Sequence, residues 1–264
     1  MWTLTRGMKA ASLAAVLLGL TISSAGQVGR SGPPAHVVDL THTLDENFPY
    51  IAVPDITFPF KRTPTATLEK DGFAINRWDI HEHIGTHIDA PNHFARDGVG
   101  LDRLPVRSLV VPLAIIDISD RARRDPDAAV TVADVTAWEQ RHGHLPDAAA
   151  VFMYSGWESR LHDPNAFVNA DATHTMHFPG ISTDAAVFLA RQRRVSGLGV
   201  DTLSIDPGNA KEFRTHTIWL GTGKWQVEAV ANLKDVPRTG ATVFVGAPNV
   251  RGATGGPVRL LAVW

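Results

Sequence analysis

The amino-acid sequence predicts a mixed α/β domain, and three observations lead to this class. Short apolar runs rich in Val, Ile and Leu recur along the chain, each bounded by Pro, Gly or Asp. Segments with helix start signals lie between them. The 264 residues, 44% of them hydrophobic, suffice for one large, well-packed domain or two small ones. Strands and helices that alternate in this way are typical of a shared α/β core.

The N-terminal segment differs from the rest of the chain. Arg6 and Lys9 precede an apolar run of about 11 residues, and small residues follow at Ser23-Ser-Ala25. A membrane-spanning helix needs roughly 20 apolar residues, so an uncleaved anchor is the lesser option. We interpret residues 1–25 as a signal peptide, which predicts a secreted or periplasmic protein without stable membrane insertion after processing.

Residues 26–34 are rich in Gly, Ser and Pro and are predicted to be a flexible leader, so the folded domain spans 35–264. Within it, five apolar runs have the length and composition of buried strands. They are Leu109 to Ile118, Ala149 to Tyr154, Val195 to Asp201, Ala241 to Ala247 and Val258 to Trp264.

Two helices are predicted from their start signals. Thr131-Val-Ala-Asp134 has a capping pattern for a helix that runs to about Arg141. Ser182-Thr-Asp-Ala185 begins a second helix that runs to about Arg194. The late segment Gly252-Ala-Thr-Gly-Gly256 does not lie between a strand and a helix, so we predict a turn there rather than a phosphate-binding loop.

The stretch from His81 to Phe94 carries the densest chemistry in the chain, with four histidines and two carboxylates around a Gly-Thr pair. Gly85 and Pro91 disfavour a helix, so a strand running into a turn is predicted. Alternate residues of an extended chain share one face. That face would carry His83, Gly85, His87, Asp89, Pro91 and His93. Imidazoles and a carboxylate on one face suit Zn²⁺, Mn²⁺ or Fe²⁺.

The segment His83-Ile-Gly-Thr-His-Ile-Asp-Ala-Pro-Asn-His93 matches without a mismatch the signature His-x-Gly-Thr-His-x-Asp-x-Pro-x-His. The chain therefore resembles the cyclase family of metal-dependent hydrolases, which includes bacterial kynurenine formamidases and isatin hydrolases. Similar segments are Asp39-Leu-Thr-His-Thr-Leu44, Ser155-Gly-Trp157 and Gly199-Val-Asp-Thr-Leu-Ser-Ile-Asp206. The resemblance implies a layered β/β/α arrangement around a barrel-like mixed sheet, and an oligomer of identical chains.

The resemblance also implies the site residues. A first metal would be held by His83, His87 and Asp89, and His93 would be the general acid/base. Dinuclear members bind a second metal through the same Asp and a downstream His and Glu, a spacing that His216 and Glu228 reproduce. The implied cofactor is Zn²⁺ or Mn²⁺, with one or two ions per chain.

Other histidines are alternatives for the second site. His81 shares the parity of the signature, and His174-Thr-Met-His177 has a short ligand-like spacing. A surface or core role is the simpler interpretation for each of them.

Aromatic residues indicate the substrate class. Tyr50, Trp78 and Trp157, with Phe48 and Phe60, are predicted to line a pocket for a flat ring. The family's formamidases commonly carry an aromatic-Pro-Gly-Asp element, whereas this chain has Phe48-Pro-Tyr-Ile-Ala-Val-Pro-Asp55. We therefore expect an exported hydrolase that cleaves an amide or cyclic-amide bond, or an ester or lactone, of a small aromatic molecule by a metal-activated water.

Composition excludes several other classes. The chain has no Cys and no Gly-x-Ser-x-Gly element, which argues against a thiolate or a serine nucleophile. A net charge of −2 without basic runs provides no nucleic-acid surface. Two alternatives stay open: a metal-dependent lyase or dehydratase, and a non-catalytic secreted metal-binding protein.

Overall fold

The computed structural model describes residues 36–264, so the predicted signal peptide and leader lie outside the described residues. A nine-stranded sheet forms the centre of this part. Its strands, in spatial order, are β1 (Val37–Asp39), β13 (Arg259–Val263), β11 (Ala241–Gly246), β5 (Val110–Asp117), β7 (Ala150–Tyr154), β9 (Gly197–Val200), β10 (Trp225–Glu228), β4 (His87–Asp89) and β12 (Gly255–Pro257).

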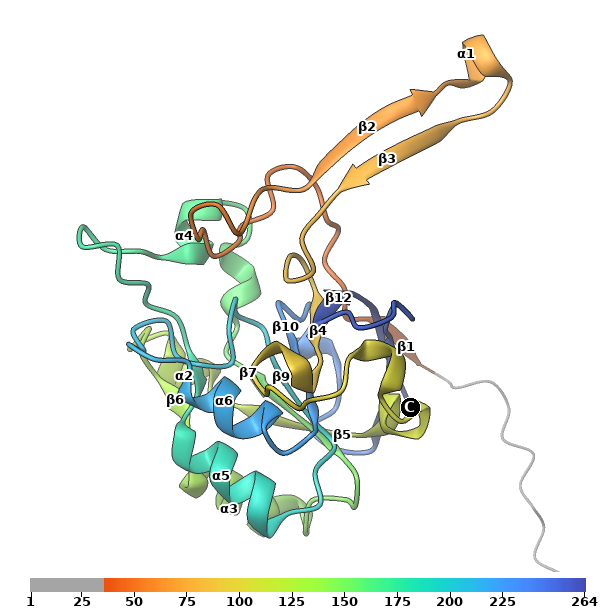
Figure 1. Cartoon of the computed structure of the whole chain (residues 1–264). Helices are drawn as coiled ribbons and strands as arrows, with labels where there is room; N and C mark the ends of the chain where they lie inside the picture. Colours follow the sequence, from red (N-terminus) through yellow and green to blue (C-terminus); the bar gives the residue numbers. More distant parts are fainter. Residues whose placement is uncertain (1–35) are drawn as a thin grey trace, which may run out of the picture. The chain divides into compact units, whose positions relative to one another are not determined.

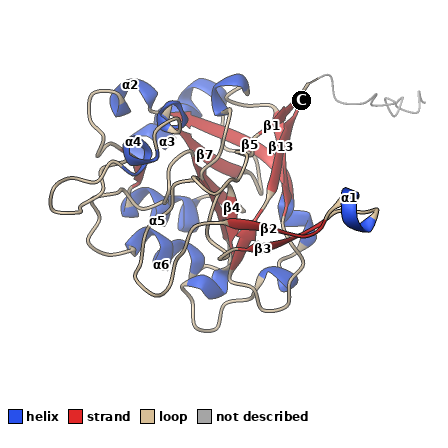
Figure 2. Cartoon of the chain, turned by 90° about the horizontal axis from the view of Figure 1, so that it is seen from above, coloured by secondary structure: helices blue, strands red, loops and turns tan. Residues whose placement is uncertain are grey.

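Strands β5, β7, β9 and β10 are parallel to one another, and all other neighbours in the sheet are antiparallel. Parallel neighbours need crossover connections, which here contain helices. Figure 2 shows these helices together on one side of the sheet. They are α3 (Val132–His142), α5 (Thr183–Gln192) and α6 (Arg214–Leu220).

Shorter elements complete the domain. The helices are α1 (Leu68–Asp71), α2 (Ser119–Ala122) and α4 (Pro164–Val168), and β6 (Ala129–Val130) pairs in parallel with β8 (Gly180–Ile181). The 3₁₀ turns are η1 (Pro91–His93), η2 (Leu101–Arg103), η3 (Val106–Leu109), η4 (Trp157–Arg160) and η5 (Leu233–Asp235).

The sheet is buried on both faces, which explains the uninterrupted apolar runs in the sequence. In β5, Leu113 and Ile115 enter one core, while Ala114 and Ile116 enter a second core against the helices. The first core receives side chains from β11 and β13 and also from β10 and β4, which lie towards the other end of the strand order. Ala231, shortly after β10, donates its N–H to the carbonyl of Leu40, shortly after β1. The sheet is therefore curled into a half-barrel, and the predicted layered α/β domain is confirmed.

The predicted elements correspond closely to observed ones. The five apolar runs contain β5, β7, β9, β11 and β13, and the two helices are α3 and α5. Thr131 and Asp134 form the predicted capping box, with each side chain accepting the other residue's backbone N–H. None of the helices in residues 36–264 is both long and apolar enough to cross a membrane.

Two local predictions are corrected. The signature stretch is extended only over His87–Asp89, because Gly85 has a left-handed φ of +69° and interrupts the strand before it. The predicted turn at 252–256 holds only in part, since Gly255–Pro257 form β12. The pairing of β12 with β4 supplies the backbone hydrogen bonds that make this short strand.

A hairpin projects from the domain and ends in α1 (Figure 1). It consists of β2 (Lys61–Ala66) and β3 (Ile75–Asp79), which pair only with each other. Several apolar side chains of this arm are exposed, and Trp78 is 66% exposed. An isolated two-stranded hairpin is marginally stable in water, so the contacts within the arm alone stabilise it only weakly.

Candidate metal centre

The floor of the candidate site is built by two neighbouring strands. His87 and Asp89 lie at alternate positions of β4, and the antiparallel register places Glu228 of β10 opposite His87. Paired residues of neighbouring strands point to the same face. The pairing therefore brings a distant carboxylate beside the signature residues, with 3.5 Å between His87 Nε2 and Glu228 Oε2.

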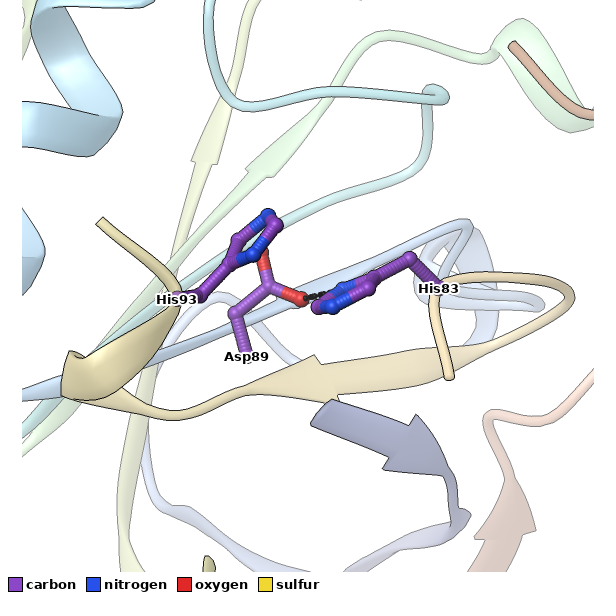
Figure 3. Close-up of side chains that lie close together, drawn as sticks. All are labelled: His83, Asp89 and His93. Atoms are coloured by element: carbon purple, nitrogen blue, oxygen red, sulfur yellow. Dashed lines mark hydrogen bonds and ion pairs between the residues drawn. The ribbon is translucent and has the colours of Figure 1, made fainter. Parts of the chain in front are cut away.

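His83 and His93 reach the same place from outside the strand. His83 lies in the bend before β4, and His93 ends η1, which Pro91 begins. Their imidazoles stack with ring centres 3.8 Å apart, and His83 Nδ1 lies 2.6 Å from Asp89 Oδ1 (Figure 3). The predicted juxtaposition of His83, His87, Asp89 and His93 is thus present, although a strand alone does not produce it.

The predicted second-site pair also joins the cluster. His216 of α6 places its Nε2 3.1 Å from Glu228 Oε1 and 3.5 Å from Asp89 Oδ2. The sets His83, Asp89, His93 and His87, Asp89, Glu228 each bring one ligand atom per residue within 4.8 Å of the others. Asp89 belongs to both sets. They group the residues differently from the prediction, since His93 joins His83 and Asp89, and His87 joins Asp89 and Glu228.

Each ligand imidazole on the floor has a fixed orientation. His216 Nδ1–H donates to Asp206 Oδ2 at 2.6 Å, and His87 Nδ1–H donates to the Gly85 carbonyl at 2.9 Å. These acceptors occupy Nδ1 of each ring, so Nε2 is the nitrogen that faces the carboxylates. Histidine ligands of metals usually have such a partner on the second nitrogen.

The two carboxylates of the cluster are buried among histidines. Asp89 is 1% exposed and Glu228 is 4% exposed, and in residues 36–264 their ion-pair partners are all histidines. Burial opposes the charged form of His87, but hydrogen bonding to Asp89 and the charges of Asp89 and Glu228 outweigh it and raise its pKa to about 9. Carboxylate oxygens and imidazole nitrogens that converge in this way fit a divalent ion with mixed N/O ligands, such as Zn²⁺ or Mn²⁺.

An apolar cavity of about 530 Å³ opens above this cluster. Its walls include Tyr50, Phe58, Phe94 and Phe213, and the six predicted ligand and acid/base residues line its floor. Burial lowers the pKa of His93 to about 4, although the charge of Asp89 opposes this shift. The imidazole is therefore neutral at neutral pH and able to accept a proton.

The structure brings only one of the three predicted substrate-binding residues to the cavity. Tyr50 lines it, whereas Trp78 lies on the projecting arm. Trp157 is 2% exposed in a separate apolar cluster, where its indole N–H donates to the Phe167 carbonyl. Packing accounts for Trp157, so it contributes no cavity surface.

The alternative second-site histidines lie elsewhere. His81 belongs to the cavity wall, against the rings of Tyr50 and Phe58. His177 pairs with Asp127 and Asp171 and does not line the cavity.

Two residues without a predicted role support the site. Asp206 orients His216 and also accepts the backbone N–H groups of Thr215 and His216. Gln226 Nε2 donates to Asp89 Oδ2 at 2.8 Å and to Glu228 Oε1 at 3.1 Å. Alternate residues of a strand share one face, so the spacing of Gln226 and Glu228 could have predicted from the sequence that Gln226 lies at the site.

Two segments that resemble the cyclase family, at residues 155–157 and 199–206, meet through a buried carboxylate. Asp201 accepts the hydroxyl of Ser155 at 2.6 Å and the backbone N–H groups of Ser155, Gly156 and Trp157. Burial raises the pKa of Asp201 to about 6, against these hydrogen bonds. The contact is structural, and it joins the end of β7 to the end of β9.

Comparisons with known proteins agree with this geometry. Residues 38–207 match the family model Cyclase, described as "Putative cyclase". An isatin hydrolase of Roseibium aggregatum is 34% identical over 245 residues, which cover 86% of this chain and 91% of that protein. A kynurenine formamidase of Salinibacter ruber is 28% identical over 201 residues, covering 75% and 84%. A crystal structure of an isatin hydrolase bound to the product analogue thioisatinate has a TM-score of 0.83 at 32% identity, covering 87% of this chain and 92% of that chain.

Proposed function

This chain belongs to the cyclase family and is a metal-dependent amidohydrolase of non-peptide C–N bonds, and from this premise we propose that it opens the cyclic amide of a small aromatic substrate. The observation that carries the proposal is the position of Asp89. This carboxylate is common to two ligand sets, and both form the floor of an apolar cavity.

A ring-opening reaction is favoured over deformylation by the cavity wall. The segment Phe48 to Asp55, which departs from the formamidase pattern, contributes Pro49, Tyr50, Ile51 and Val53 to the lining. Higher identity to the isatin hydrolase than to the formamidase points the same way. A flat bicyclic amide matches a cavity whose walls are aromatic and whose polar groups lie at one end.

The proposed metal ligands are His83, His87 and Asp89 for one ion, with His216 and Glu228 sharing Asp89 for a second. A divalent ion supplies Lewis acidity and lowers the pKa of a bound water towards about 7. The ion is Zn²⁺ or Mn²⁺ by the chemistry of the donors.

We assign proton transfer to His93. Its neutral ring stands beside Asp89 and against His83, with the aromatic ring of Phe94 on another side. A neutral imidazole at this position accepts a proton from the attacking water and returns it to the leaving nitrogen.

Two further proposals concern the whole protein. Residues 1–25 direct export, and N-terminal sequencing of the protein made in a bacterial host should find a mature chain that begins near Gly26. The exposed apolar residues of the arm, including Phe73, Ile75 and Trp78, support assembly into a homo-oligomer. Light scattering on the intact protein and on Trp78→Ser tests this assembly.

The proposed reaction is tested by supplying isatin to the Zn²⁺- or Mn²⁺-loaded protein and following ring opening by absorbance. Turnover should depend on the ion, disappear in His87→Ala and persist in His177→Ala, whose histidine lies outside the site. In ¹⁸O-labelled water the product should gain one labelled oxygen. Conversion of a hydroxy acid without consumption of water, with no turnover of isatin, would favour a lyase. Metal binding without turnover of isatin, N-formylkynurenine or an aryl lactone would favour a binding protein.

A further inference from the structure

The third signature imidazole, His83, is oriented by a part of the chain that the proposed function does not use. His83 Nε2 lies 3.0 Å from Thr254 Oγ1. The Thr254 hydroxyl donates to Glu82 Oε2, and the Thr254 backbone N–H donates to the same oxygen at 3.0 Å. A chain of hydrogen bonds thus runs from His83 through Thr254 to a carboxylate.

The number of available protons determines the direction of each bond. A hydroxyl has one hydrogen, and the Thr254 hydroxyl gives it to the Glu82 carboxylate, which has none to offer. Towards His83 the hydroxyl oxygen can only accept, so His83 Nε2–H donates to it. The other ring nitrogen, Nδ1, lies 2.6 Å from Asp89 Oδ1 and is therefore the nitrogen that faces the site.

From this geometry we propose that Thr254 and Glu82 are positioning residues that make Nδ1 of His83 the metal-binding nitrogen. The inference rests on the proposed function, since it takes His83 and Asp89 as ligands of one ion. It distinguishes His83 from His87 and His216, whose Nδ1–H groups donate to other acceptors and whose Nε2 atoms face the site.

The segment that leads into β12, Thr254-Gly255, is shaped for this role. Gly255 pairs with Asp89 across β12 and β4, which holds the preceding Thr254 behind the His83 ring. A Cβ atom at Gly255 would lie 2.5 Å from His83 Cε1 and 2.9 Å from His83 Nδ1. Only glycine at this position leaves room for the ring, so the segment supplies both the space and the acceptor for His83.

The test measures Zn²⁺ affinity by chelator competition on the full-length protein without substrate. Thr254→Val keeps the shape of the side chain and removes the acceptor, and Thr254→Ser restores it. We expect Thr254→Val to weaken binding of the ion held by His83 by about 10- to 100-fold, the usual effect of losing an outer partner of a histidine ligand. Glu82→Gln should weaken it less, because an amide oxygen still accepts from Thr254.

The matched control is Thr41→Val. Thr41 also has a hydroxyl in two hydrogen bonds, here to the backbone of Leu260, outside the site. The Thr41→Val variant should have a lower melting temperature and an unchanged affinity for Zn²⁺. Histidine ¹⁵N spectra of the Zn²⁺-loaded protein give a second readout: the His83 Nδ1 resonance should shift on binding while Nε2 stays protonated, and Thr254→Val should lose that single tautomer.

The outcomes separate this inference from the proposed function. Unchanged Zn²⁺ affinity in Thr254→Val, or coordination of His83 through Nε2, would overturn the inference even if isatin were hydrolysed. If Thr254→Val binds Zn²⁺ more weakly than Thr254→Ser and the unmodified protein, but no cyclic amide is hydrolysed, the proposed function is contradicted and the inference stands. Absence of Zn²⁺ binding by the unmodified protein would overturn both.

Discussion

Glu228 lies directly opposite His87 in the antiparallel pair of β10 and β4, and 3.5 Å separates its Oε2 from His87 Nε2. The pair belongs to a network in which His216 contacts both Asp89 and Glu228. His87 and Asp89 lie in β4, whereas His216 and Glu228 lie more than 100 residues later in the chain, in α6 and β10. The pairing of β10 with β4 in the folded sheet brings the two groups together. The proposed second ion therefore depends on residues that are far from the signature in sequence.

Metal stoichiometry tests the second site. The unmodified protein, purified without chelator or an affinity-tag metal, should contain two ions per chain by elemental mass spectrometry. His216→Ala should retain one, because His83, His87 and Asp89 remain. A single ion in both proteins would indicate a mononuclear site, and two ions in both would exclude His216 as a ligand.

Removal of His93 tests proton transfer. His93→Ala should retain its metal and lose about 10²- to 10⁴-fold in kcat, the range expected for a general acid/base. Rate measurements on metal-loaded samples check this. Loss of an ion from the variant would instead make His93 a metal ligand. Its ring nitrogen lies within 4.8 Å of ligand atoms of His83 and Asp89, so the geometry allows this alternative.

The metal-free protein should lose stability as the pH rises. The pKa of His87 in the folded chain is raised to about 9 from its ordinary 6.5, so the folded state holds this proton more tightly than the unfolded state. The resulting stabilisation is complete below pH 6.5 and is lost as the pH rises through 9, an effect of about 3 kcal/mol. Chemical unfolding of chelated protein at pH 6 to 9 measures it, and the Zn²⁺-loaded protein, in which His87 is a neutral ligand, is the control.

The left-handed turn before β4 should be needed for metal binding. Gly85→Ala places a Cβ at φ +69° and 3.3 Å from Leu44 Cδ1, and the backbone conformation alone costs about 1–2 kcal/mol. We expect reduced stability in urea together with weaker metal binding, since His83 and His87 flank the turn. Gly72→Ala, at φ +73° on the arm with no atom within 4 Å, provides the same backbone strain away from the site. Equal metal affinities in the two variants would contradict the prediction.

Tyr50 and Trp78 should behave differently when truncated. Tyr50→Ala removes an aromatic wall of the cavity and should raise KM for an aromatic amide about 10-fold, because loss of a buried contact of this size costs about 1–3 kcal/mol. Trp78→Ala should leave KM unchanged at protein concentrations where the assembly is intact. Steady-state kinetics with isatin distinguish the two, and a matching rise in KM for Trp78→Ala would place the arm over the substrate.

Local pattern was sufficient for most of the secondary structure. The strands β5, β7, β9, β11 and β13 are recognisable because burial on both faces leaves an uninterrupted apolar run, and the capping residues Thr131 and Ser182 mark where α3 and α5 begin. The short strand β12 could not be predicted in this way, since a Gly-Gly-Pro sequence has little strand preference of its own and forms a strand here through its pairing with β4.

The apolar runs predict the α/β class, and the resemblance of the motif to the cyclase family implies an amidohydrolase with a metal centre at His83, His87 and Asp89, because ligand chemistry and spacing are encoded in adjacent residues. The tertiary structure decides what surrounds that centre: the register that places Glu228 at His87, Asp206 behind His216, Thr254 behind His83, and the burial of Trp157 away from the cavity. These contacts join residues that are far apart along the chain, and pairing and packing across the sheet, not local sequence, determine which of them meet.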